Sequence, residues 1–159
     1  MLKLYKFADG AKEYWETWDN EDGSHIVHWG ELGTKGNSKT VKNSIFKKAV
    51  KTIQAEIDSK VSNGFKQIDI EEHYILLIEY EIDGMGNTED LDKRHRLEER
   101  MNETLGWTGL GHCDGGSIGS GTMEVCSFVV DFDIAKKVIE EDLEGSEFSN
   151  YTRIYDENE

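Results

Sequence analysis

The sequence contains no proline, only two cysteines and no long apolar run. Its longest uninterrupted apolar stretch is residues 75–78, far shorter than the roughly 20 residues that span a bilayer. Lys3 and Lys6 interrupt the amino-terminal residues, which therefore lack the apolar core of a secretory signal. Cys113 and Cys126 suit a reduced setting, although a single disulfide would also fit the sequence. These absences predict a cytoplasmic protein without a membrane partner.

The sequence also lacks the common catalytic and metal-binding motifs. It has no His-Glu-x-x-His, no Gly-x-Ser-x-Gly and no dinucleotide-binding glycine fingerprint. His112, Cys113 and Cys126 do not have the paired spacing of zinc ligands. A row of alternating acids could gather for calcium, but a solvent-facing surface is the simpler interpretation: Glu79, Glu81 and Asp83. We therefore expect a protein that is not an enzyme and that holds no metal or cofactor.

Charge is the most uneven property of the chain. The 159 residues carry a net charge of −15, which opposes generic binding to nucleic acid or anionic lipid. Residues 71–159 contain 7 basic and 23 acidic side chains, whereas residues 32–68 contain eight lysines and two acids. This shift predicts two domains, residues 1–70 and residues 71–159. The basic patch is either a binding surface or an ordinary solvated face.

The first half reads as four strands followed by one helix. Alternating apolar residues and turn signals predict strands at residues 1–8, 12–19, 24–29 and 38–43. A helix is expected over residues 45–61, capped by Ser44 and stopped at Asn63-Gly64. Its apolar positions follow the helical period: Ile45, Phe46, Ala49, Val50, Ile53 and Ile57.

The second half has the order β-α-β-β-α-β, which is that of a ferredoxin-like α+β sandwich. We expect a helix that begins at Asn87 or Thr88, and a glycine-rich hairpin turn at residues 115–121. That turn enters a strand and has no Gly-Lys-Ser/Thr, so it does not fit a phosphate-binding loop. The remaining segments follow in order: strand 73–82, helix to 105, strand or irregular segment 108–114, strand 123–131, helix 133–143 and strand 151–155.

One segment of the first half carries a recognisable motif, Trp29-Gly30-x-x-Gly33-Thr34-x-Gly36. Aromatic-rich strands precede it, and a helix and a Lys-x-x-x-Gly-aromatic pattern at residues 60–65 follow it. In this order the elements resemble a WGR domain over about residues 1–68. The resemblance implies DNA contact, because in poly-ADP-ribose polymerases the motif tryptophan of this family packs against the sugar-phosphate backbone. Bacterial members occur alone or beside other modules.

The sequence departs from that family at Glu31, which stands where the motif has arginine. Arginine offers a planar fork to phosphate, whereas glutamate repels it. The resemblance therefore points to contact through the neighbouring side chains, and weak binding is expected. The candidate residues for nucleic-acid or partner binding are Trp29, Gly30, Lys35, Lys39 and Lys42. The competing interpretation is that Trp29 is a core or strand-end aromatic and that the glycines shape a turn.

Two functional hypotheses follow. The first is a non-enzymatic binding or regulatory protein with a WGR-like module that binds nucleic acid weakly. In its regulatory form, the acidic half of the chain would compete with nucleic acid for the lysines of the first half. The second is an acidic inhibitor of a basic protein partner, because charge complementarity speeds such association. Residues 109–121 resemble a glycine-rich hairpin of ferredoxin-like domains in small bacterial proteins, some of them toxin-immunity proteins, which is the reason for the second hypothesis.

Overall fold

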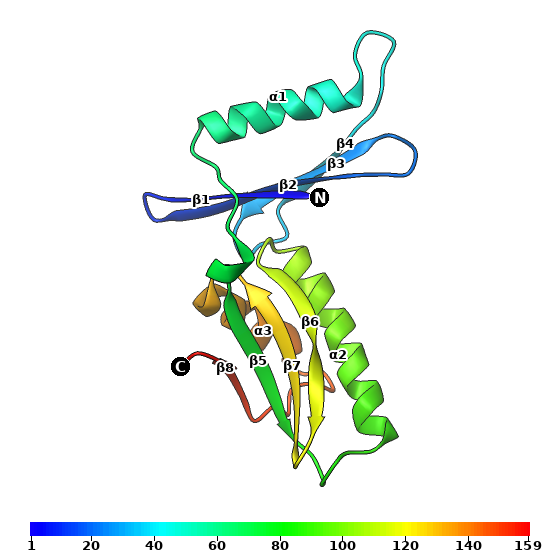
Figure 1. The fold of residues 1–159 in the computed structure, drawn as a ribbon, viewed down its shortest axis with the longest axis vertical. Coiled ribbons are helices and arrows are strands. Elements are labelled where there is room, and N and C mark those ends of the chain that lie inside the picture. Colours follow the sequence, from blue (N-terminus) through cyan, green and yellow to red (C-terminus); the bar gives the residue numbers. More distant parts are fainter. The chain divides into compact units, whose positions relative to one another are not determined.

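The computed structural model describes residues 1–159 and divides into two compact units, residues 1–68 and residues 69–159. Each unit contains one four-stranded antiparallel sheet, and the chain has three α-helices (Figure 1). The predicted α+β class is therefore confirmed. No helix combines the length and the apolar character needed to cross a membrane.

The first unit is a meander of strands with one helix across a face of the sheet (Figure 1). Its strands lie in the order β1-β2-β3-β4, each antiparallel to the next. The elements are β1 (Leu2–Ala8), β2 (Ala11–Asp19), β3 (His25–Glu31), β4 (Asn37–Val41) and α1 (Ala49–Ser62). After α1 the chain returns to β1, where the backbone of Lys66 exchanges hydrogen bonds with that of Tyr5.

The core of the first unit is small and lies between the sheet and α1. Strand side chains alternate between the two faces, so residues two apart in β2 and β3 share the face that α1 covers. The buried cluster combines these with residues from α1 and the segment after it: Leu4, Trp15, Val27, Ile53 and Phe65. Trp29, Val41 and Ile57 pack against the margin of this cluster.

The expected start of α1 is wrong, since the helix begins at Ala49 rather than at Ile45. Ser44 does not cap it; the Ser44 hydroxyl accepts hydrogen bonds from the backbone of Phe46 (3.3 Å) and of Lys47 (3.0 Å), which closes a tight turn. Asn43 Oδ1 instead accepts from the Ala49 amide at 2.8 Å, at the first turn of the helix. Because the turn takes residues 44–47 out of the helix, their side chains never reach the sheet.

The second unit places its strands in the order β6-β7-β5-β8, with every neighbouring pair antiparallel. Figure 1 shows α2 and α3 on one side of this sheet. A short 3₁₀ turn precedes the first strand. The elements are η1 (Ile70–Glu72), β5 (Tyr74–Glu81), α2 (Thr88–Gly106), β6 (Gly111–Gly119), β7 (Thr122–Val129), α3 (Phe132–Leu143) and β8 (Arg153–Asp156).

Both helices of this unit begin at side-chain caps. Asn87 and Asp90 form a reciprocal capping box at α2, and Asp131 accepts a hydrogen bond from Ile134 at α3. One side of each helix is fully buried against the sheet. The buried helical residues are Leu97, Met101, Leu105, Ala135, Ile139 and Leu143. Leu91, expected on that side of α2, is 37% exposed instead.

The glycine-rich run is not the expected hairpin turn. Most of it belongs to β6, the pairing with β7 shifts between Cys113 and Gly116, and only Ser120 and Gly121 lie between the strands. A Cβ added at Gly116 would lie 2.3 Å from the Glu124 carbonyl oxygen. Glycine is needed here because the two backbones approach closely at a bulge, and not because the chain turns.

Candidate functional site

Trp29 lies on the face of β3 that α1 covers, and it is half-buried. It borders a shallow pocket of about 140 Å³ between the sheet and α1. The residues that line the pocket are Trp15, Val27, Trp29, Lys39, Glu56 and Lys60. The indole therefore has a structural role, because it packs against the apolar cluster, and it remains partly accessible to solvent.

Lys39 is the one candidate lysine that the structure brings to Trp29. Its ammonium lies 5.8 Å from the centre of the Trp29 ring, a cation–π distance. The same ammonium forms an ion pair with Glu56 of α1 at 2.6 Å. Lys39 therefore already has an anionic partner, which a phosphate would have to displace.

Glu31 stands at the end of β3, opposite Glu13 of β2. The two carboxylates face the same side of the sheet as Trp29, because they lie two residues from Trp29 and Trp15. Like charges directly opposite one another are unfavourable, and both carboxylates would repel an anionic ligand near Trp29. Glu31, which replaces the motif arginine, thus adds a second negative charge beside Glu13.

Gly30 and Gly36 have a structural role. A Cβ at Gly36, whose φ is +59°, would lie 2.1 Å from the Trp29 carbonyl oxygen and 2.5 Å from the Tyr14 hydroxyl. A Cβ at Gly30 would lie 2.8 Å from the Gly36 Cα. The glycines of the motif therefore allow two backbone segments and the Tyr14 hydroxyl to pack closely against one another.

Lys35 and Lys42 lie beyond opposite ends of β4, so the structure does not gather the candidate lysines into one cluster. Six residues lie between them, five of which form β4, a span of roughly 20 Å. Lys35 belongs to the loop before β4, and Lys42 lies near the β2–β3 turn, where its charge helps to lower the pKa of Asp22 behind the larger effect of the Ser24 hydrogen bonds. Of the five candidates, only Trp29 and Lys39 meet.

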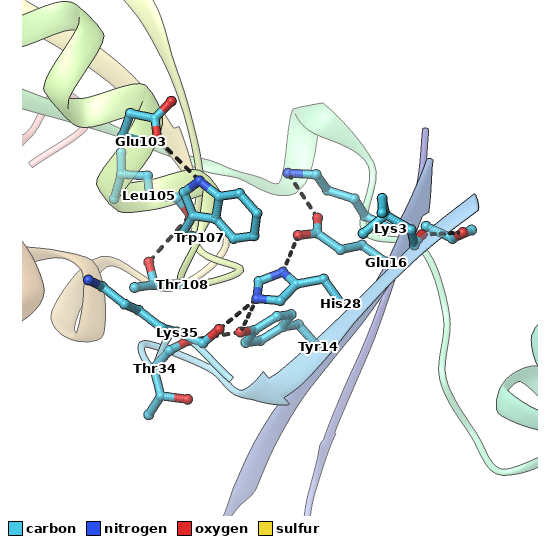
Figure 2. A network of polar contacts seen from close by, with 12 residues as sticks. Lys3, Tyr14, Glu16, His28, Thr34, Lys35, Glu103, Leu105, Trp107 and Thr108 are labelled. Atoms are coloured by element: carbon cyan, nitrogen blue, oxygen red, sulfur yellow. Dashed lines mark hydrogen bonds and ion pairs between the residues drawn. The ribbon is translucent and has the colours of Figure 1, made fainter. Parts of the chain in front are cut away.

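The opposite face of the same strands carries a buried polar network that the sequence did not reveal (Figure 2). His28 Nε2 donates to the Lys35 carbonyl at 2.6 Å, and its Nδ1 lies 2.7 Å from Glu16 Oε1. The Tyr14 hydroxyl lies 3.1 Å from Nε2 and donates to the Thr34 carbonyl at 2.8 Å. Burial, with the Glu16 charge, raises the pKa of Tyr14 to about 12. The network ties the motif loop to the sheet.

The most exposed apolar side chains of the first unit were also missed. We call residues 42–48, between β4 and α1, the tip. Within it Ile45 is 93% and Phe46 is 92% exposed, whereas the sequence placed both on the buried side of a helix. The signal that could have identified them is charge, since residues 32–55 contain six lysines and no acid. All six are exposed: Lys35, Lys39, Lys42, Lys47, Lys48 and Lys51.

The second unit contributes an acidic pocket of about 370 Å³ at the end of α3. It is lined by Glu140, Glu141, Glu144, Gly145, Ser149 and Tyr151. Both cysteines are free and half-buried. Glu79 pairs with Arg153 at 3.1 Å rather than joining a row of carboxylates. No three His, Cys, Asp or Glu side chains gather in a way that could hold a metal ion.

Known proteins give no match to this chain. No protein-family model matches it, and neither a curated protein nor a solved structure does so.

Proposed function

We propose that this protein is a non-enzymatic binding protein whose first unit is WGR-like and makes weak, salt-sensitive contact with nucleic acid. The observation that carries the proposal is the stretch of residues 32–55, in which six exposed lysines occur without an acid. Lysines neutralise phosphates and release counterions, which drives such binding even when the net charge of the protein is negative.

The order of elements in the first unit supports the WGR-like part of the proposal. Two antiparallel strands precede β3, which carries Trp29 and Gly30, and a fourth strand and a helix follow, in the order that the resemblance implies. In the second unit, the strand order β6-β7-β5-β8 with two helices on one side supports a ferredoxin-like sandwich.

The lysines near α1 are better placed for phosphate than those near Trp29. Lys39 is paired with Glu56, and Glu31 and Glu13 lie on the same face. Lys47 and Lys48 are exposed and form no ion pair. We therefore place the main electrostatic contact at the tip and the start of α1, with Trp29, Gly30 and Lys35 at its far margin.

The test compares two double variants of the full chain that change the net charge equally. Lys47→Glu with Lys48→Glu alters the tip, whereas Lys66→Glu with Lys137→Glu alters two exposed lysines elsewhere. Binding of a labelled single-stranded DNA is measured by fluorescence anisotropy at low salt and at tenfold higher salt. We expect wild-type affinity to fall roughly 100-fold over that range if about three phosphates are contacted. The tip variant should lose more than the control, and equal losses would reject this site.

A second candidate function rests on the acidic pocket of the second unit. Three glutamates and Tyr151 line a space that would accommodate a lysine or arginine side chain of a basic protein. In this version the protein masks a basic partner, and charge complementarity speeds association. Glu140→Lys with Glu144→Lys should abolish capture of such a partner in a pulldown from the native cell. Unchanged capture would place the contact elsewhere.

A further inference from the structure

The tip presents two large apolar side chains side by side in solvent. Ile45 and Phe46 are 93% and 92% exposed, whereas Phe7, another exposed aromatic of the same unit, is 41% exposed. Isolated apolar residues are normal at a surface, but a folded chain gains nothing by holding an adjacent pair in water. The connection that carries them extends beyond the sheet as a loop (Figure 1).

The backbone holds these side chains outward. The Ser44 hydroxyl accepts from the amides of Phe46 and Lys47, and the Ser44 amide donates to the Lys47 carbonyl at 2.9 Å. Asn43 ties the following segment to the first turn of α1. A partner would therefore meet a turn that is already shaped, which lowers the conformational cost of binding.

Positive charge flanks the apolar pair along the chain. Lys42 and Lys47 flank it in the sequence, Lys48 stands directly before α1, and Lys51 lies in the first turn of that helix. The nearest acids along the chain are Glu31 and Glu56, at either end of the lysine stretch. A matching partner must therefore combine negative charge with an apolar surface.

A phospholipid surface and a nucleic acid both combine these properties, but the tip suits the second better. The side chains of Ile45 and Phe46 together hold fewer carbons than a myristoyl chain, which alone gives only marginal membrane binding. A nucleic acid offers base faces, on which one aromatic ring suffices to stack, and apolar side chains act as wedges between bases. Its phosphates lie beside those faces, within reach of the lysines.

We propose that the tip is the base-contacting element of the first unit, with Phe46 stacking on an unpaired base, Ile45 packing beside it, and Lys42, Lys47 and Lys48 holding the flanking phosphates. This inference rests on the proposed nucleic-acid function and names the site and the ligand state, a single strand or an unpaired base. It moves the aromatic contact from Trp29, which packs against α1, to a residue outside the motif.

The experiment uses the full chain and two labelled single strands of equal length, one with bases and one with abasic sugars throughout. Phe46→Ala is compared with Phe7→Ala, and melting temperatures check that both variants remain folded. We expect Phe46→Ala to lower affinity for the base-bearing strand roughly 5- to 100-fold and to leave binding to the abasic strand unchanged. Phe46→Trp, which keeps an aromatic face, should retain wild-type affinity, and Phe7→Ala should match wild type on both strands.

The outcomes separate the inference from the function on which it rests. Salt-sensitive binding that Lys47→Glu with Lys48→Glu removes, but that Phe46→Ala leaves intact, overturns the stacking role and keeps the proposed function. Equal losses on the base-bearing and abasic strands also overturn it. No wild-type binding to either strand removes both proposals. Vesicles of phosphatidylserine and phosphatidylcholine form a further arm, and Phe46-dependent binding to these vesicles in place of DNA would assign the tip to lipid.

Discussion

The two units build the same kind of sheet but stabilise it differently. In the second unit, two capped helices cover one side of the sheet, and their inner side chains are fully buried aliphatic residues. In the first, a single helix covers a smaller apolar cluster, and the other face holds a histidine, a glutamate and a tyrosine. The unit with the smaller apolar core thus relies more on buried polar contacts, whose loss is costly.

The largest expected effect comes from breaking that polar network. His28→Leu removes the hydrogen bonds of the imidazole to Glu16 and to the Lys35 carbonyl, and leaves Glu16 with Lys3 as its ion-pair partner. Each buried polar group left without its hydrogen bond costs about 1–3 kcal/mol, and more when the group is charged. Thermal unfolding followed by circular dichroism measures the change. The matched control is His25→Leu on the same strand, whose partner Asp19 is 82% exposed, and it should cost about 1 kcal/mol or less. Similar losses for both variants would contradict the importance of the network.

A smaller effect is expected where the motif glycines pack. Gly36→Ala forces a Cβ into the Trp29 carbonyl and the Tyr14 hydroxyl at a positive φ, and we expect about 2–4 kcal/mol of destabilisation. Gly145→Ala in the second unit shares the positive φ (70°) but meets nothing within 4 Å. It should cost about 1–2 kcal/mol, from the backbone term alone. Urea denaturation of the two variants would separate the steric part from the conformational part.

Alkaline pH should weaken both units through their buried tyrosines. Burial raises the pKa of Tyr14 to about 12 and that of Tyr80 still further. An unfolded tyrosine ionises near pH 10, so the stability from these groups is complete below about pH 10 and falls as pH rises towards their folded pKa values. Absorbance at the tyrosinate wavelength and circular dichroism should change together. Tyr14→Phe should remove part of this pH dependence, and an identical alkaline transition would count against it.

The smallest effect concerns the thiols of the second unit. Burial raises the pKa of the Cys113 thiol and raises that of Cys126 to about 11. At pH 8 a thiol with a pKa near 11 has roughly 200-fold less thiolate than an ordinary cysteine, so alkylation should be correspondingly slow. Iodoacetamide labelling read by mass spectrometry measures it. Labelling as fast as in urea-unfolded protein would show that the thiols are not protected.

The sequence was a good guide where local signals were strong and unopposed. The cap at Asn87 stands directly before a helical pattern, and α2 begins at Thr88, where that signal places it. Ser44 was misleading because a serine hydroxyl serves a helix cap and a tight turn equally well. In the structure Ser44 closes a turn, and the side chain of Asn43 accepts the hydrogen bond from Ala49 at the start of α1 instead. The glycines of β6 failed as a guide because close approach of two backbones also requires glycine.

The candidate site was harder to predict because it depends on which face of a sheet is covered. Alternation puts Trp29 and His28 on opposite faces of β3, but it does not say which face α1 will cover. Glu56 lies seventeen residues from Lys39 in the sequence, so their ion pair follows only from the packing of α1. The exposure of Phe46 depends on the turn at Ser44. Each of these facts comes from tertiary structure.

Strand β4 has a consequence for how the protein behaves at high concentration. It is an edge strand of only five residues, and one side of its backbone has no neighbouring strand. Such edges invite pairing with strands of other molecules, and proteins resist this with short, charged edge strands, lysine above all. Lys39 within β4, with Lys35 and Lys42 beyond its ends, places like charges along that edge. Lys42, which is proposed to meet phosphate, therefore also helps to guard the sheet against aggregation.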